Sequence, residues 1–182
     1  MGLKDKLAPF GILNMMTGLL TIIFGVSFET SDFIVDCLEQ WWDDNKSQNG
    51  HINQLVINLD NGPQNSSHRT QFMKRIIEFA DKNNLEIVLA YYPPYHSKYN
   101  PVERCWGILE NHWSATLLNT LEITLAWAKT MTWKGLSPVV KLLETTYQKG
   151  VKLSKKAFTA MANRIGRSPL LPKYYMTIQP QI

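Results

Sequence analysis

The sequence predicts an α/β fold, in which a mixed β-sheet is flanked by helices and followed by a basic, helical C-terminal extension. Over residues 1–118, short apolar segments of strand length alternate with segments whose apolar residues recur at helical spacing. Turn-forming residues separate these segments, and beyond residue 118 the pattern is helical and rich in lysine. We therefore expect an α/β domain over residues 1–118 and an extension over residues 119–182.

The first elements are expected to be two buried strands, Phe10–Leu13 and Leu19–Val26, joined by a turn at residues 14–18. The sequence carries no charge between Lys6 and Glu29, so this stretch could instead be a signal peptide or a membrane anchor. The turn divides it into pieces much shorter than the ~20 residues that a spanning helix needs. A hairpin without membrane association is therefore the prediction.

A helix, a loop and a strand are expected next. Thr30 and Ser31 are N-cap candidates for an amphipathic helix that ends near Asp44, and the polar residues Asn45–Asn53 are expected to form a loop. The apolar residues Leu55–Leu59 then predict a buried strand, which stops at a turn signal beginning with residue 60.

A second amphipathic helix is expected at Arg69–Asn83, and a second apolar strand at Leu85–Tyr91. A strand, helix and strand of this length predict a parallel pair with a right-handed crossover. After a proline-rich loop, Asn100 and Pro101 predict the N-cap and first residue of a third helix.

The C-terminal part is expected to contain helices at Glu122–Met131, Pro138–Gln148 and Ser154–Arg164. From Lys129 to the end the net charge is +9, whereas residues 1–128 carry −5. This asymmetry suggests a polyanionic partner for the basic part, although a solvated basic helix face would give the same pattern. The tail from residue 169 either packs on the domain or lies extended on a partner.

Two carboxylates occupy special positions in this predicted fold. Asp60 directly follows a central strand, and Glu103 lies in the first turn of a helix after a proline-rich loop. If the strands before them are neighbours, both side chains converge on one edge of the sheet. Mg²⁺ prefers oxygen ligands from one or two carboxylates together with waters and phosphates, so the pair predicts a metal site for phosphoryl transfer.

Each carboxylate also has a purely structural interpretation. Asp60, Asn61 and Gly62 are typical of an Asx-turn, in which the carboxylate accepts hydrogen bonds from nearby backbone N–H groups. Glu103 lies three residues after Asn100, the position of a capping-box glutamate. Neither residue alone identifies a catalytic site, and only their combination with the intervening loop favours one.

Two sequence blocks resemble a known family. Residues 59–69 read LDNGPQNSSHR and residues 92–107 read YPPYHSKYNPVERCWG, and they look like the second and third catalytic blocks of DDE transposases. The resemblance is to the ISAzo family of bacterial insertion-sequence transposases, and more distantly to mariner-like elements. It implies a ribonuclease-H-like fold, a pair of Mg²⁺ or Mn²⁺ ions, and DNA partners, namely the element ends and the target. A cytoplasmic, nucleoid-associated protein that could self-associate is expected.

By this resemblance, Asp60 matches the second catalytic aspartate and Glu103 the third acidic residue, 43 positions later, and both are expected to hold metal. The side chains expected beside the metal, where they could hold a DNA strand, are Tyr95, His96, Lys98 and Arg104. Their structural alternative is a rigid loop that packs on the sheet.

The chain departs from the family pattern at its N-terminus. The family places a first catalytic aspartate on a strand upstream of the hairpin, and here the only acidic residue in that region is Asp5, between two lysines. We therefore expect an N-terminally truncated transposase that lacks the first strand and is inactive alone. The alternative is a non-catalytic nucleic-acid-binding remnant whose basic tail contacts phosphates.

Overall fold

The computed structural model describes residues 7–93, 96, 99–114 and 119–181. Seven strands and five helices occur in this part of the chain. The strands are β1 (Ala8–Leu13), β2 (Leu20–Gly25), β3 (Gln54–Leu59), β4 (Glu86–Tyr91), β5 (Val139–Leu143), β6 (Ile165–Arg167) and β7 (Tyr175–Ile178). The helices are α1 (Ser31–Asn49), α2 (Thr70–Asn83), α3 (Pro101–Trp113), α4 (Leu121–Thr130) and α5 (Lys155–Ala162). These elements form two compact units.

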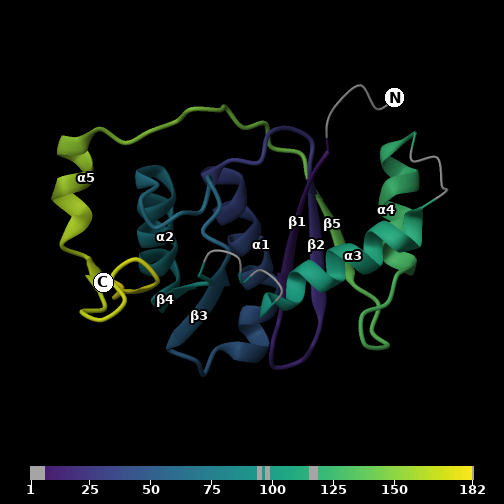
Figure 1. The fold of residues 1–182 in the computed structure, drawn as a ribbon, viewed down its shortest axis with the longest axis horizontal. Helices are drawn as coiled ribbons and strands as arrows, with labels where there is room; N and C mark the ends of the chain where they lie inside the picture. Colours follow the sequence, from purple (N-terminus) through teal and green to yellow (C-terminus); the bar gives the residue numbers. More distant parts are fainter. Residues whose placement is uncertain (1–6, 94–95, 97–98, 115–118, 182) are drawn as a thin grey trace. The chain divides into compact units, whose positions relative to one another are not determined.

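The first unit comprises Met1–Glu29 and Asn100–Tyr147 and contains a three-stranded sheet in the order β1-β2-β5 (Figure 1). The predicted hairpin is present, with β1 antiparallel to β2. Asn14 forms its turn, because its side-chain oxygen accepts hydrogen bonds from the backbone N–H groups of Met16 (2.9 Å) and Thr17 (3.2 Å). β5 pairs in parallel with β2.

The core of the first unit lies between this sheet and helices α3 and α4. β2 contributes Leu20, Ile22 and Phe24, which alternate along the strand and therefore share one face. They pack in a cluster with buried apolar residues from α3 and α4, including Cys105 and Leu109, which are spaced one helical turn apart.

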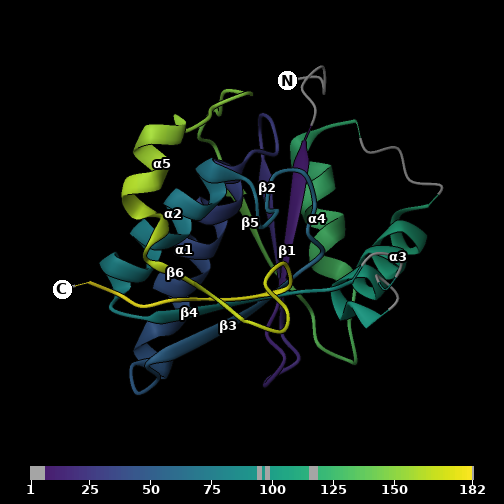
Figure 2. The same cartoon turned by 60° about the vertical axis from the view of Figure 1, so that its left-hand side comes forward.

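The second unit comprises Thr30–Tyr99 and Gln148–Ile182. Its four-stranded sheet has the order β3-β4-β7-β6, and Figure 2 shows α1 and α2 on one face of it. The predicted parallel pair is present: β3 and β4 pair from Gln54 opposite Glu86 to Leu59 opposite Tyr91. In the described part of the chain no strand pairs with the other edge of β3.

The C-terminal tail completes the sheet of the second unit. β7 pairs antiparallel with β4, and β6 pairs antiparallel with β7. Arg164, in the turn just before β6, donates hydrogen bonds to both carboxylate oxygens of Asp81 in α2 (2.9 and 2.6 Å) and to the Gln179 carbonyl (2.7 Å). The Gln181 backbone N–H donates to the same carboxylate (2.8 Å). These bonds fasten the tail to α2, so the tail is part of the fold.

Three expectations about the elements were wrong. The helix expected at Pro138–Gln148 is absent, and strand β5 occupies part of that stretch because its backbone pairs in parallel with β2. The loop expected from residue 45 begins only after Asn49, because Asn45 and Asn49 each donate a side-chain hydrogen bond to the carbonyl four residues earlier and α1 continues. The C-terminal extension contributes three strands as well as helices, so it is not simply helical.

The α/β class is confirmed, with two mixed sheets where one was expected. Among the described residues, no helix is both long enough and apolar enough to cross a membrane. The stretch considered as a possible anchor contains β1 and β2.

Candidate active site

Asp60 lies at the carboxyl end of the parallel pair β3 and β4. The last register pair of the two strands is Leu59 opposite Tyr91. The ladder continues one step further, because the Tyr92 backbone N–H donates to the Leu59 carbonyl (2.8 Å). The Asp60 side chain is exposed. This is the sheet edge at which ligands are commonly bound in α/β folds.

The loop after β3 fixes the Asp60 carboxylate through one of its two oxygens. Oδ1 accepts hydrogen bonds from the Gly62 backbone N–H (3.1 Å) and from the Asn65 side-chain Nδ2 (2.9 Å). The Asx-turn expected as the structural alternative is therefore present. Asn61 supports it in the left-handed conformation, with φ 63°. No described residue donates a hydrogen bond to Oδ2, so this oxygen is available to a cation.

A small hard cation beside this carboxylate would meet oxygen atoms as ligands. A Cβ atom on Gly62 would stand 3.3 Å from both Asp60 carboxylate oxygens and 3.4 Å from Asn65 Oδ1, so only glycine leaves this space open. Asn65 Oδ1 is buried and has no hydrogen-bond partner among the described residues. Buried polar atoms are normally satisfied, and an oxygen left over beside a carboxylate is the kind of ligand that Mg²⁺ takes.

Contacts from other elements of the second unit hold this loop in place. The Tyr91 hydroxyl of β4 donates to the Asn65 carbonyl (2.9 Å), and the Ser31 hydroxyl of α1 donates to the Gln64 carbonyl (2.6 Å). Arg167 of β6 donates to the Ser67 carbonyl (3.0 Å). Burial raises the pKa of the Tyr91 hydroxyl well above its ordinary value, so this group stays a hydrogen-bond donor at neutral pH. The loop is thus tied to three elements.

Glu103 lies in the first turn of α3, as expected. Pro101 is the first helical residue, and the Glu103 backbone N–H donates to the Asn100 carbonyl (3.2 Å). The Asn100 side chain makes no capping hydrogen bond. The Glu103 carboxylate is exposed and forms no hydrogen bond or ion pair with any described residue. The capping box is therefore not formed, and this carboxylate is open to a cation as well.

Asp60 belongs to the second unit and Glu103 to the first. That the two carboxylates share bound metal therefore stays a prediction. Within the described residues no group of three or more histidine, cysteine, aspartate or glutamate side chains is arranged to hold a metal ion.

The four residues expected to contact DNA are partly described. Tyr95 and Lys98 lie outside the described residues. His96 is exposed and stacks on Tyr99, with ring centroids 5.7 Å apart and planes inclined by 23°. Arg104 is exposed on α3. DNA contact by these side chains stays a prediction.

Sequence reasoning assigned no role to Asn65, Tyr91 or Arg167, which position the Asp60 loop. Asn65 lies inside the motif that resembles the transposase block, so its proximity to Asp60 in sequence could have suggested a role. The other two come from β4 and β6, and no local pattern links them to Asp60.

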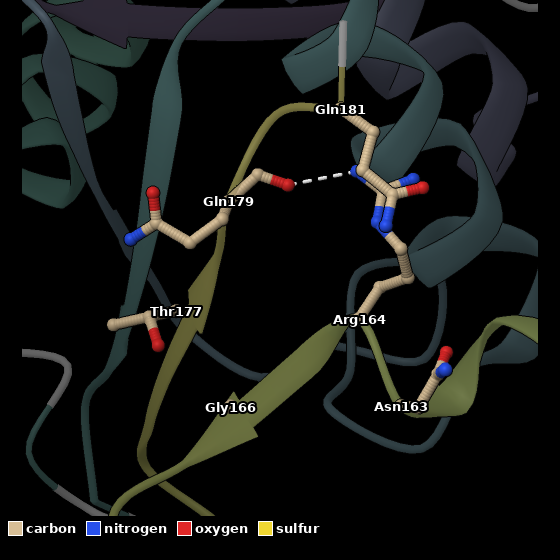
Figure 3. Close-up of a pocket in the computed structure, with 6 residues that line it drawn as sticks. All are labelled: Asn163, Arg164, Gly166, Thr177, Gln179 and Gln181. Atoms are coloured by element: carbon tan, nitrogen blue, oxygen red, sulfur yellow. Dashed lines mark hydrogen bonds between the residues drawn. The ribbon is translucent and has the colours of Figure 1, made fainter.

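A pocket of about 320 Å³ lies elsewhere in the second unit (Figure 3). It is lined by Asn163, Arg164, Gly166, Thr177, Gln179 and Gln181. Figure 3 shows the Arg164 side chain reaching toward the end of the tail, where its guanidinium meets the Gln179 carbonyl. This guanidinium already pairs with Asp81, so the charged group of the pocket serves to attach the tail.

The sequence matches the family model described as the Rhodopirellula transposase DDE domain over residues 2–180. Comparisons with curated proteins and with solved structures gave no match. Since the match spans nearly the whole chain, this protein belongs to that family of transposase DDE domains.

Proposed function

We propose that the chain is the catalytic part of a DNA transposase and that Asp60 and Glu103 are its metal-holding carboxylates. Transposase DDE domains act on DNA and use divalent metal ions. Bound Mg²⁺ or Mn²⁺, as a pair of ions, supplies Lewis-acid stabilisation of the attacking and leaving oxygens in phosphoryl transfer. Such a protein is expected at the nucleoid, where its substrate lies.

The observation that supports this proposal best is that the two oxygens of the Asp60 carboxylate have different surroundings. Oδ1 is committed to the turn through Gly62 and Asn65, whereas Oδ2 has no donor among the described residues. The hydrogen bonds on Oδ1 hold the side chain in one orientation, and this preorganisation favours a cation on the other oxygen. The unpartnered Asn65 Oδ1 beside it is a candidate additional ligand.

The DNA strand is proposed to pass along the side chains that follow β4. His96 and Arg104 are both exposed, and Tyr95 and Lys98 neighbour them in the sequence. Cationic groups neutralise phosphates, and aromatic rings stack on bases, so this composition suits a DNA strand held next to the carboxylates.

Catalysis is proposed to need a third carboxylate besides Asp60 and Glu103. Two-metal phosphoryl transfer relies on a ligand that bridges the ions, and the family resemblance assigns this ligand to an upstream aspartate. Where the protein nicks supercoiled plasmid in Mg²⁺, Asp60→Asn and Glu103→Gln should each abolish the nicking, and nicking that survives both substitutions would refute their proposed role.

Iron-directed cleavage of the protein backbone tests the shared metal site. Fe²⁺ with ascorbate and peroxide releases hydroxyl radicals at the metal position, so the full chain should be cut near residue 60 and near residue 103. Asp60→Asn and Glu103→Gln should each suppress both cuts, and excess Mg²⁺ should compete. Glu144→Gln, which changes another exposed carboxylate of the first unit, is the matched control and should leave both cuts unchanged.

The two carboxylates would be shown to act separately if Glu103→Gln removed only the cut near 103 and left the cut near 60 at full strength. That result would refute the shared site.

A non-catalytic DNA-binding protein is the second candidate. It is favoured by the composition of residues 148–182, which contain seven lysines and arginines and no acidic residue. Sequence-independent binding that weakens steeply with salt and is unchanged in Asp60→Asn, together with no iron-directed cut near residue 60, would select this alternative.

A further inference from the structure

The loop between β6 and β7, Ser168–Tyr174, exposes apolar side chains, and hydrogen bonds fix its backbone conformation. Leu170 is 90% exposed, Leu171 is 54% exposed, and Tyr175 at the start of β7 is 43% exposed. Single exposed apolar residues are common, and two consecutive exposed leucines in one loop are a candidate contact surface.

Hydrogen bonds within the loop maintain this exposure. The Leu171 backbone N–H donates to the Ser168 hydroxyl (3.2 Å), and the Tyr174 and Tyr175 backbone N–H groups donate to the Leu171 carbonyl (3.0 and 2.9 Å). Arg167 closes the base of the loop by donating to the Pro172 carbonyl (2.9 Å). Leu170 is therefore held away from the core by the shape of the loop.

The loop leaves the sheet at the same edge as Asp60. Leu59 and Tyr91 are register partners, and the Tyr91 backbone N–H donates to the Tyr174 carbonyl (2.8 Å). These three residues form one row across β3, β4 and the start of β7, and Asp60 follows the first of them.

A side chain also links the two loops directly. Arg167 donates to the Ser67 carbonyl (3.0 Å), and the Ser67 backbone N–H donates to the Asn61 side-chain oxygen (3.1 Å). Two hydrogen bonds thus connect the base of the hairpin to the residue next to Asp60. All of these residues lie in the second unit.

The charge around the loop favours a polyanion over an apolar protein partner. Lys173 is exposed within the loop, and residues 148–182 carry seven positive charges without a single acidic side chain. Concentrated positive charge attracts phosphates and disfavours association with a second copy that carries the same charge.

We propose that the Ser168–Tyr174 loop is a DNA-contact element in which Leu170 packs against a base next to the scissile phosphate and Lys173 pairs with the phosphate backbone. Apolar side chains on DNA-binding proteins insert between base steps and unstack them, and such unstacking gives a metal site access to a strand end. This inference rests on the proposed transposase function, because it takes the Asp60 edge as the place where DNA is cut.

Base unstacking by the full chain can be measured with a short blunt-ended DNA duplex that carries 2-aminopurine next to one end, in a Ca²⁺ buffer. The wild-type chain should increase 2-aminopurine fluorescence on binding. Leu170→Ser should lower this increase about fivefold, whereas DNA binding, followed by fluorescence anisotropy, should change much less. Leu170→Phe should retain the increase. Met16→Ser is the control, because Met16 is 94% exposed in the hairpin turn of the other unit.

The outcomes separate this inference from the proposed function. Wild-type chain that binds no DNA would refute both. DNA binding with equal fluorescence increases for Leu170→Ser and Met16→Ser would refute the DNA-contact element alone. Loss of a dimer in Leu170→Ser by sedimentation velocity, with fluorescence unchanged, would assign the loop to self-association and also overturn the inference.

Discussion

The attachment of the C-terminal tail can be tested by changing Asp81 to Asn. The Asp81 carboxylate accepts two hydrogen bonds from Arg164, of 2.9 and 2.6 Å, and one from the Gln181 backbone N–H, of 2.8 Å. The Arg164 side chain is 12% exposed and that of Asp81 is 33% exposed. Asp81→Asn keeps the shape of the side chain but removes its charge and one acceptor, so Arg164 is left mostly buried without a counter-charge.

The expected loss is set by the value of charge-assisted hydrogen bonds. Such bonds contribute about 1.5–3 kcal/mol when buried, and the partial exposure of Asp81 brings the expected loss to the lower end, about 1.5 kcal/mol. For a chain of this size, a loss of this magnitude lowers Tm by roughly 3–6 °C. Thermal unfolding at neutral pH measures the shift, and hydrogen exchange should show the loss of protection in β7.

The pH dependence supplies a second readout of the same ion pair. The hydrogen bond from Arg164 lowers the pKa of Asp81 in the folded protein, so the pair stabilises the fold above the ordinary carboxyl pKa of about 3.9. This contribution disappears as the pH falls below that value toward the folded-state pKa. The difference in stability between wild type and Asp81→Asn should therefore shrink as the pH falls below about 4.

Asp43→Asn is the matched control. Its carboxylate pairs with Lys46 at 2.6 Å, but the side chains of Lys46 and Asp43 are 55% and 48% exposed. An exposed pair of this kind contributes at most about 0.5 kcal/mol. A Tm for Asp81→Asn equal to that of Asp43→Asn would show that the tail is not held by this contact.

Tyr91→Phe removes the hydroxyl that donates to the Asn65 carbonyl and should cost about 1–1.5 kcal/mol in urea unfolding. Because burial raises the pKa of Tyr91, wild type should also lose stability relative to this variant as the pH rises above about 10. Cys105 is 0% exposed, and burial raises the pKa of its thiol to about 11. At about pH 8, iodoacetamide should therefore label Cys105 only as fast as the first unit opens, and peptide mass spectrometry can follow this labelling. Gly11→Ala would place a Cβ 2.7 Å from the Trp106 ring and should destabilise the chain by about 1–3 kcal/mol, with a smaller effect in a Trp106→Leu background.

Local patterns predicted most of the elements. The hairpin, α1, α2, α4 and the parallel strands were predicted because each has apolar residues at a clear spacing and a turn or cap at its ends. β5 could not be predicted in this way, because the short and mostly apolar segment Val139–Leu143 suits a helix or a strand equally. Its conformation is decided by pairing with β2, more than a hundred residues earlier, and no sequence window contains that information.

In the candidate site, too, features that depend on neighbouring residues could be predicted, and features that depend on distant residues could not. The position of Asp60 could be predicted, since a buried strand followed by Asn61 and Gly62 places it at a sheet edge. The contacts that hold its loop could not be predicted, because they join residues far apart in the sequence. Tyr91 lies 26 residues after the residue that it contacts, and Arg167 lies 100 residues after its partner. The sequence therefore predicts where the carboxylate is, and the tertiary structure explains why it is held still.

The two interpretations of Asp60, a turn residue and a metal ligand, exclude each other only if they need the same oxygen. The structure assigns the turn to Oδ1, where Gly62 and Asn65 donate, and no described residue donates to Oδ2. A turn alone does not require a negative charge, because an asparagine oxygen at position 60 could accept the same hydrogen bond from Gly62. A hard cation does require it, since carboxylate oxygens are its preferred ligands. Asp60→Asn should therefore retain the stability of the loop but lose metal binding. This variant separates the two roles, whereas Asp60→Ala removes both oxygens and cannot separate them.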